Sequence, residues 1–265
     1  MKNQWRVLAT AIMFLTRIPV GQAASGEADD FAKSTQYFPL VGVLIGTLLS
    51  LVFIAACQIW TSSIAIGLTL LVAVLLTGGF HEDGLADVAD SAGAWTKERK
   101  IEIMRDSRIG TYGSLALILV LLLKYAALTT ITKTGLLSEP GASTTAWGIS
   151  ATLVLAHVLS RWSILPMTRF TPYVRELSSN KVFADGVTVH RLLTGSLISL
   201  VVLIICSTAL GVSAYVAFVA TLAVIWLSRR WYLRAIGGIT GDCLGATNQL
   251  VELVVYLCIA GATTQ

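Results

Sequence analysis

Long apolar runs separated by short polar segments dominate the pattern of this chain. They lie near residues 37–59, 62–80, 111–131, 145–167, 192–210, 212–228 and 243–261. A helix needs about 20 consecutive apolar residues to cross the hydrocarbon core of a bilayer, and each run has roughly that length. The pattern therefore predicts an all-α fold: a polytopic membrane helix bundle of about seven transmembrane helices, forming a single integral membrane domain over residues 1–265.

The segment before the first long run has a different character. Residues 1–24 have the outline of a secretory signal peptide, because Lys2 and Arg6 precede a short apolar stretch. Arg17 and Pro19 interrupt that outline, and secretion of the downstream end would put every basic loop on the wrong side of the membrane. We therefore expect a short N-terminal helix that lies in the membrane interface.

Composition and charge agree with a membrane protein and set its orientation. Hydrophobic residues make up 55% of the chain and charged residues only 13%. Of the 19 Lys and Arg residues, 16 fall in segments that alternate onto one side of the membrane. These are Lys2, Arg6, Arg17, Lys33, Lys97, Arg99, Lys100, Arg105, Arg108, Arg169, Arg175, Lys181, Arg191, Arg229, Arg230 and Arg234. Because basic residues mark cytoplasmic loops, we expect a cell inner membrane protein with its N-terminus inside and its C-terminus outside.

The net charge of +4 follows from this inside bias, and we expect contact with membrane lipids rather than nucleic acid. Cys57, Cys206, Cys243 and Cys258 are scattered through apolar segments without a paired spacing. They are typical of small hydrophobic residues rather than of a disulfide framework or zinc site.

The acidic residues gather in segment 78–110, on the predicted cytoplasmic side, which holds seven of the fifteen Asp and Glu residues. Asp83, Asp87 and Asp90 stand at i, i+4 and i+7, so a helix would present them on one face. Like charges in that arrangement repel one another unless a cation lies between them. The pattern predicts a Mg²⁺ site formed by Asp83, Asp87 and Asp90 with Glu82, since oxygen ligands suit that metal.

Other polar residues flank this acidic helix. Gly78 and Gly79 predict a turn or close approach where it begins, and we place His81 beside the site. Arg105 and Arg108 are suited to holding a pyrophosphate near a metal, although they could equally be ordinary loop charges. Asp106 between them is a candidate for catalysis.

Charged and polar residues also interrupt the apolar runs. Lys124 and Arg161 lie within predicted helices, where charge is costly and indicates either function or a buried pair. Asp242, Asn248 and Glu252 suggest a second, substrate-binding wall of the same site on the last helix. The alternative is an N-capping Asp with interhelical hydrogen bonds from the other two.

Three separated motifs resemble one family. They are His81-Glu82-Asp83-Gly84-Leu85-Ala86-Asp87-Val88-Ala89-Asp90, Arg105-Asp106-Ser107-Arg108-Ile109-Gly110 and Gly241-Asp242-Cys243-Leu244-Gly245-Ala246. Together with Phe14-Leu15-Thr16-Arg17-Ile18-Pro19 and Phe38-Pro39-Leu40-Val41-Gly42, they make the whole chain similar to cobalamin synthase, the adenosylcobinamide-GDP ribazoletransferase family.

The resemblance implies a Mg²⁺-dependent enzyme of the cytoplasmic membrane. In that family α-ribazole, or its 5'-phosphate, attacks the cobinamide-side phosphorus of adenosylcobinamide-GDP and GMP leaves. Soluble cobalamin-assembly enzymes would supply the substrates, and the oligomeric state stays open. Asp83, Asp87 or Asp90, or else Asp106, would accept the proton of the attacking hydroxyl, and the pattern does not choose among them.

Two alternatives remain at this stage. The segment around Asp83-Gly84-Leu85-Ala86 is similar to the start of the CDP-alcohol phosphotransferase signature. That signature expects Arg after Ala86 and wider spacing of the later Asp residues, whereas here Asp87 follows Ala86 and Asp90 comes three residues later. The kinship is therefore one of chemistry. A secondary transporter would instead use Lys124, Arg161 and Glu252 as an ion relay. The density of acid at the predicted inner edge and the lack of an internal repeat favour the transferase.

Overall fold

The computed structural model describes residues 2–24, 27–133, 142–174 and 186–263, and these form helices with no strand among them. In chain order the α-helices are α1 (Lys2–Leu15), α2 (Ala28–Ser34), α3 (Phe38–Ala56), α4 (Ser62–Thr77), α5 (Phe80–Ser91), α6 (Lys97–Met104), α7 (Thr111–Lys133), α8 (Ala142–Phe170), α10 (Val189–Leu210), α11 (Val212–Ile236) and α12 (Gly241–Thr263). Short 3₁₀ turns, η1 (Gly21–Ala23) and η2 (Thr35–Tyr37), flank α2. The predicted all-α fold is confirmed.

The long apolar runs become α3, α4, α7, α8, α10, α11 and α12. In the described part of the chain, six spans are long and apolar enough to cross a membrane, and a seventh is obtained only when α4 and α5 count together. That pair is bent by 89°. We treat α4 as the spanning part and α5 as a helix at the end of the bundle, which agrees with the seven predicted spans.

Helix α8 runs through the middle of the bundle and is almost entirely buried. Its backbone lies directly against α3 because two α3 residues are glycine. A Cβ at Gly46 would lie 2.5 Å from the Cα of Val154, and a Cβ at Gly42 would overlap the carbonyl oxygen of His157. Small residues that admit such close backbone contact are typical of helix pairs in membranes.

The outer faces of α7, α10 and α11 are apolar. Their exposed side chains include Leu115, Ile118, Leu119, Leu122, Leu193, Leu197, Leu200, Ile204, Val216, Val219 and Leu227. Contiguous apolar surface of this extent is rare on soluble monomers. It is the surface that a lipid-facing helix requires.

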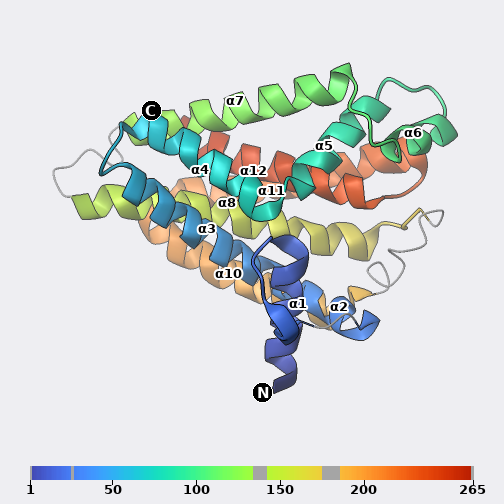
Figure 1. Ribbon diagram of the computed structural model, residues 1–265, viewed down its shortest axis with the longest axis horizontal. Helices are drawn as coiled ribbons and strands as arrows, with labels where there is room; N and C mark the ends of the chain where they lie inside the picture. The colour runs from blue at the N-terminus through green and yellow to red at the C-terminus, as the bar shows by residue number, and fades with distance from the viewer. Residues whose placement is uncertain (1, 25–26, 134–141, 175–185, 264–265) are drawn as a thin grey trace.

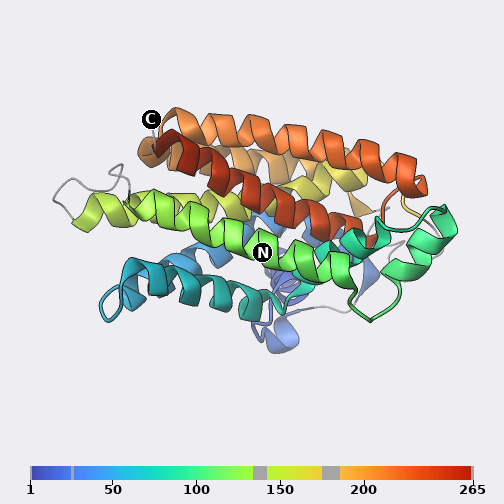
Figure 2. The same cartoon turned by 90° about the horizontal axis from the view of Figure 1, so that it is seen from above.

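The two ends of the bundle differ. Figure 1 shows α5, α6 and the turn between α11 and α12 at one end, and the α3–α4 turn and the C-terminus at the other; Figure 2 agrees. The basic segments of α6 and the loop after it, of the end of α8, of the start of α10 and of the α11–α12 turn therefore lie toward one end, as the positive-inside pattern requires, whereas α1 crosses nearer the middle of the bundle (Figure 1). Which end faces the cytoplasm stays a prediction, and Arg175 and Lys181 lie outside the described residues.

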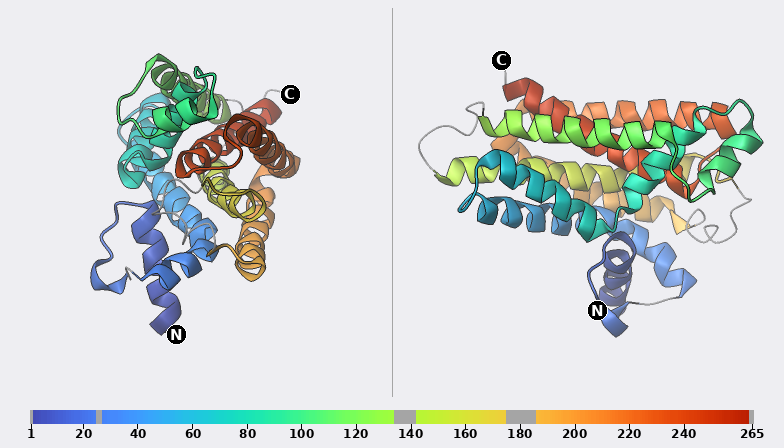
Figure 3. Two further views of the ribbon diagram at one scale, coloured as in Figure 1. Left: turned by 90° about the vertical axis from the view of Figure 1, so that its right-hand side faces the viewer. Right: turned by 45° about the horizontal axis from the view of Figure 1, so that its top comes forward.

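Helix α1 runs across the long axis of the bundle rather than along it (Figures 1 and 3). Trp5 is exposed on this helix, and Arg6 pairs with the buried carboxylate of Asp30 on α2 at 2.6 Å. A helix lying along a membrane surface, with an exposed Trp, has this orientation. The interfacial position of the N-terminal helix remains a prediction, and the orientation of α1 across the bundle is compatible with it.

Candidate active site

Two glycines turn the chain from α4 into α5. Gly78 and Gly79 adopt φ values of +70° and +69°, in the left-handed region that favours glycine. Arg17 packs on this turn: its backbone N–H donates to the carbonyl oxygen of Leu76 at 2.7 Å, and its guanidinium occupies the space that a Cβ at residue 78 would need. The turn predicted at this pair is confirmed, and it directs α5 across the end of the bundle.

Helix α5 crosses α12 closely, again through glycines. A Cβ at Gly84 would lie 2.8 Å from the carbonyl oxygen of Asp242, and one at Gly245 would lie 3.2 Å from that of His81. Because the two backbones touch here, side chains that flank the crossing are brought together. Asp83 on α5 and Asp242, in the first turn of α12, line one pocket, and Asp87 on α5 lies close enough to both to be affected by their charges.

The site carries an excess of negative charge. Burial, together with the carboxylates of Asp242, Asp83 and Asp90, raises the pKa of Asp87 to about 7. Asp242 accepts a hydrogen bond from the hydroxyl of Thr240 at 3.2 Å. Among the described residues, no Lys or Arg forms an ion pair with Asp83, Asp87 or Asp242. The structure therefore joins two of the predicted acids to one from the predicted second wall.

The donor set of this site suits magnesium. Within the described ranges, no group of three or more His, Cys, Asp or Glu side chains is placed so that it could hold a metal ion. Mg²⁺ is usually held by one or two carboxylates together with waters and substrate phosphates, so a complete protein cage is not required. Carboxylates from two helices, without a cationic partner, are the kind of oxygen donors that such an ion uses.

The other two predicted metal ligands point elsewhere. The carboxylate of Asp90 accepts hydrogen bonds from the backbone N–H groups of Gly110 and Gly113, at 2.7 and 2.8 Å, and so caps the start of α7. Glycine at both positions leaves room for it. One oxygen of Glu82 is buried and has no hydrogen-bond partner among the residues that the structure describes. The four acids thus do not share one environment: Asp83 and Asp87 lie near Asp242, Asp90 caps α7, and Glu82 is buried.

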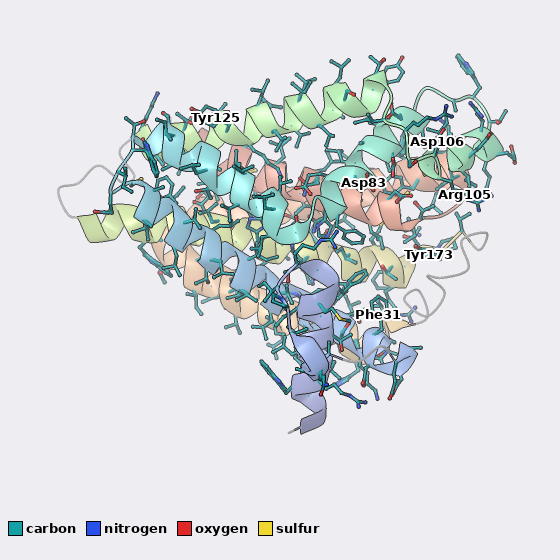
Figure 4. All side chains as sticks on the ribbon, viewed as in Figure 1. Phe31, Asp83, Arg105, Asp106, Tyr125 and Tyr173 are labelled. Atoms are coloured by element: carbon teal, nitrogen blue, oxygen red, sulfur yellow. The ribbon has the colours of Figure 1, made fainter. Side chains whose placement is uncertain are left out.

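Arg105, Asp106 and Arg108 lie in and beside the loop after α6. Figure 4 labels Arg105, Asp106 and Asp83, which all lie toward the same end of the bundle. Arg108 is exposed and pairs with Asp106 at 2.6 Å. Hydrogen bonds from Arg108 lower the pKa of Asp106 to about 2. Such a weakly basic carboxylate is poorly suited to accept a proton at neutral pH.

A pocket of about 190 Å³ adjoins the carboxylates. Asp83, Asp242 and His81 form its polar side. The aromatic part of its lining comes from α1, α2, α3, α5 and the segment after α8, through Phe14, Phe31, Phe38, Phe80 and Tyr173. Both ring nitrogens of His81 are buried and have no hydrogen-bond partner among the described residues, which agrees with its predicted place beside the site.

Asn248 and Glu252 lie deeper in the bundle, away from Asp242. Glu252 is buried and accepts from Lys124 at 2.7 Å and from Arg161 at 3.0 Å. His157 Nδ1 lies 2.7 Å from the Arg161 guanidinium. This buried charge cluster, formed by Lys124, His157, Arg161 and Glu252, ties α7, α8 and α12 together. Since Lys124 and Arg161 are both paired, the buried-pair alternative describes their geometry.

Asn248 is also buried, and neither atom of its amide group has a hydrogen-bond partner in the described part of the chain. It does not line the pocket. The structure therefore brings only Asp242 from the predicted second wall to the α5 carboxylates, while the substrate-binding roles assigned to Asn248 and Glu252 stay predictions.

Sequence reasoning did not assign a role to the aromatic wall or to the crossing glycines. Phe14 and Phe38 lie within two of the motifs that carry the family resemblance, and Gly84 and Gly245 lie within two others. That coincidence was an available signal. Their function could not be read from it, because it depends on contacts between segments far apart in the chain.

Comparison with known proteins identifies the family. The family described as Cobalamin-5-phosphate synthase matches residues 7–260. A protein of Vibrio cholerae serotype O1, named adenosylcobinamide-GDP ribazoletransferase, is 38% identical over 98% of this chain and 95% of its own length. Proteins of the same name from Shewanella amazonensis and Leptothrix cholodnii are 41% and 38% identical, over 97% and 96% of this chain and 96% and 95% of their own lengths.

No solved structure matches the chain. The sequence match nevertheless covers nearly all of its length, including the three motifs that meet at the α5–α12 crossing and the loop beside it. The chain with this membrane helix bundle and this acidic site therefore belongs to the cobalamin-5-phosphate synthase family.

Proposed function

We propose that this protein joins α-ribazole, or its 5'-phosphate, to adenosylcobinamide-GDP and releases GMP. The relatives named adenosylcobinamide-GDP ribazoletransferase support this assignment, since they match almost the whole chain. The structural observation that carries it is the meeting of Asp83, Asp87 and Asp242 beside a pocket. A transfer between a nucleoside and a pyrophosphate needs such a site, with oxygen ligands for a metal next to space for a substrate.

In the proposed reaction a ribose hydroxyl oxygen of α-ribazole forms a bond to the cobinamide-side phosphorus. The bond from that phosphorus to the bridging oxygen breaks, and GMP leaves with its electrons. The hydroxyl proton passes to a carboxylate. We place proton acceptance within the α5–α12 carboxylate group rather than at Asp106, because the low pKa of Asp106 makes it a weak base.

Magnesium belongs to this proposal. One or two of the carboxylates of Asp83, Asp87 and Asp242 would hold it, with the pyrophosphate of the substrate as a further ligand. When bound, Mg²⁺ neutralises charge on the pyrophosphate and on the leaving phosphate. Asp90 would act indirectly, by fixing the start of α7 beside the site.

Arg105 and Arg108 are proposed to hold phosphoryl oxygens of the GDP-activated substrate. Guanidinium groups can bind phosphate with two parallel hydrogen bonds, which ammonium groups cannot. The Asp106 carboxylate, which already binds Arg108 through both Nε and Nη2, would orient that side chain.

We also propose that the acidic end faces the cytoplasm of a cell whose inner membrane holds the bundle. The basic segments that surround this end support that orientation. Nucleotide substrates and soluble cobalamin-assembly enzymes would then approach from the inside.

The direct test supplies purified protein in liposomes with adenosylcobinamide-GDP, α-ribazole and Mg²⁺. GMP and a cobalamin should appear together in equal amounts. Solute flux across the liposome membrane without GMP release would favour the transporter alternative.

A further inference from the structure

The pocket beside the carboxylates is lined largely by aromatic side chains, which suit a flat aromatic ring of a substrate. We propose that Phe14, Phe31, Phe38, Phe80 and Tyr173 bind the flat benzimidazole ring of α-ribazole, and that the pocket thereby presents the ribose of this acceptor to Asp83 and Asp242. This inference rests on the proposed function, and it assigns the acceptor rather than the GDP-activated substrate to the pocket.

The phenylalanines form one continuous cluster. The ring of Phe14 stacks on Phe38 with centroids 5.8 Å apart, and meets the edges of Phe31 at 4.8 Å and Phe80 at 5.4 Å. Offset and edge-to-face contacts of this kind are favourable between aromatic rings. Such an aromatic lining is suited to a planar aromatic ring in the adjoining pocket.

The segment that carries Tyr173 is also fixed in place. Its neighbours pair with the chain just before α12: Val174 N–H donates to Ile239 at 2.9 Å, and Ile239 N–H donates to Pro172 at 2.9 Å. Figure 4 shows Tyr173, Phe31 and Asp83 toward the same end of the molecule. The Tyr173 part of the aromatic lining and the start of α12, with Asp242, are therefore held together by this short connection.

Size and polarity favour the benzimidazole over the other parts of the two substrates. A cavity of about 150 Å³ lined by apolar side chains can hold benzene. A pocket of about 190 Å³ is therefore suited to a bicyclic ring and far too small for a corrin ring. Guanine carries donors and acceptors along its edges that would need partners, whereas the carbon edge of a benzimidazole is satisfied by an apolar wall.

The polar side of the pocket then has a clear use. A ring held by the phenylalanines would place its sugar near Asp83 and Asp242, which line the same pocket. Holding the attacking hydroxyl near the reacting phosphorus is a large part of catalysis by proximity. The pocket would thus serve to position the nucleophile as well as to bind it.

Steady-state kinetics of two variants tests the assignment. Phe80→Leu and Phe31→Leu remove aromatic area from side chains that are not fully buried, so both proteins should fold. We expect the KM for α-ribazole to rise about three- to tenfold, with the KM for adenosylcobinamide-GDP nearly unchanged. Phe218→Leu is the matched control, because Phe218 packs on Trp162 at 5.6 Å and does not line the pocket; it should leave both constants unchanged.

Inhibition by free 5,6-dimethylbenzimidazole gives a second measurement that does not depend on the variants. It should compete with α-ribazole but not with adenosylcobinamide-GDP, and Phe80→Leu should weaken it. Competition with adenosylcobinamide-GDP instead, or variants that raise only the KM of that substrate, would assign the pocket to the guanine end and overturn the inference. Unchanged constants in both variants would overturn it too. In each of those cases the wild-type protein still releases GMP, whereas absence of GMP release would refute the proposed function itself.

Discussion

Arg105 and Arg108 are expected to bind the substrate pyrophosphate, but Arg108 pairs with Asp106 rather than with the α5–α12 carboxylates. If both arginines hold pyrophosphate oxygens, replacing either by Lys removes a two-point hydrogen bond while keeping the charge. Arg105→Lys and Arg108→Lys should raise the KM for adenosylcobinamide-GDP by about tenfold and the KM for α-ribazole much less. Equal changes for both substrates, measured in the same assay, would indicate a structural role.

Asp90 illustrates what the residue pattern could and could not predict. Spacing correctly placed Asp83, Asp87 and Asp90 on one short helix, and composition pointed to the end of the bundle where the site lies. Spacing alone could not indicate that Asp90 would find the start of α7, because its partners Gly110 and Gly113 lie 20 and 23 residues further along the chain. Nor could it pair Asp87 with Asp242 across more than half the sequence.

At the scale of elements, the α5–α12 crossing depends on two residues without side chains. An added methyl group at Gly84 would lie 2.8 Å from the Asp242 carbonyl oxygen, so Gly84→Ala must push the helices apart and separate the carboxylates. We expect turnover to fall at least about tenfold, since displacements near 1 Å are costly in active sites. Gly67→Ala on α4 is the matched control, because a Cβ there meets nothing within 4 Å.

That control should keep full activity and lose no thermal stability, because Ala favours a helix more than Gly does. Equal turnover in Gly84→Ala and the wild type would contradict the close crossing. The apolar runs predicted the long helices, including α4, and the glycine pair predicted the turn at Gly78 and Gly79. Which helix α5 would pack against depended on contacts that no local pattern records.

The buried charge cluster gives a second prediction at this scale. Glu252→Gln would leave the charges of Lys124 and Arg161 buried without their anion. Breaking such a pair usually costs about 3–5 kcal/mol, so the melting temperature in detergent should drop markedly. Lys124→Met in addition should recover part of the loss, because it removes one unmatched charge. An unchanged melting temperature with lost activity would instead support the substrate-binding role predicted for Glu252.

At the scale of the whole molecule, the described basic segments between α6 and the α11–α12 turn share one end of the bundle with the acidic site, while α1 lies nearer its middle (Figure 1). The positive-inside pattern places that end in the cytoplasm. A reporter active only outside the cytoplasm should therefore be active when fused after Gln265 and silent when inserted near Trp95, whose side chain is 99% exposed. The reverse result would put the carboxylates on the side without nucleotide substrates.

The central claim is that carboxylates from α5 and α12 form the catalytic, metal-dependent site. The most direct measurement is GMP release as a function of Mg²⁺ concentration for the wild type, Asp83→Asn and Asp87→Asn, with melting of each protein measured without metal. We predict turnover lower by orders of magnitude and a weaker response to Mg²⁺, with metal-free stability unchanged or higher because like charges no longer repel one another. Near-wild-type turnover in both variants, or loss of stability with full activity per folded molecule, would contradict the account.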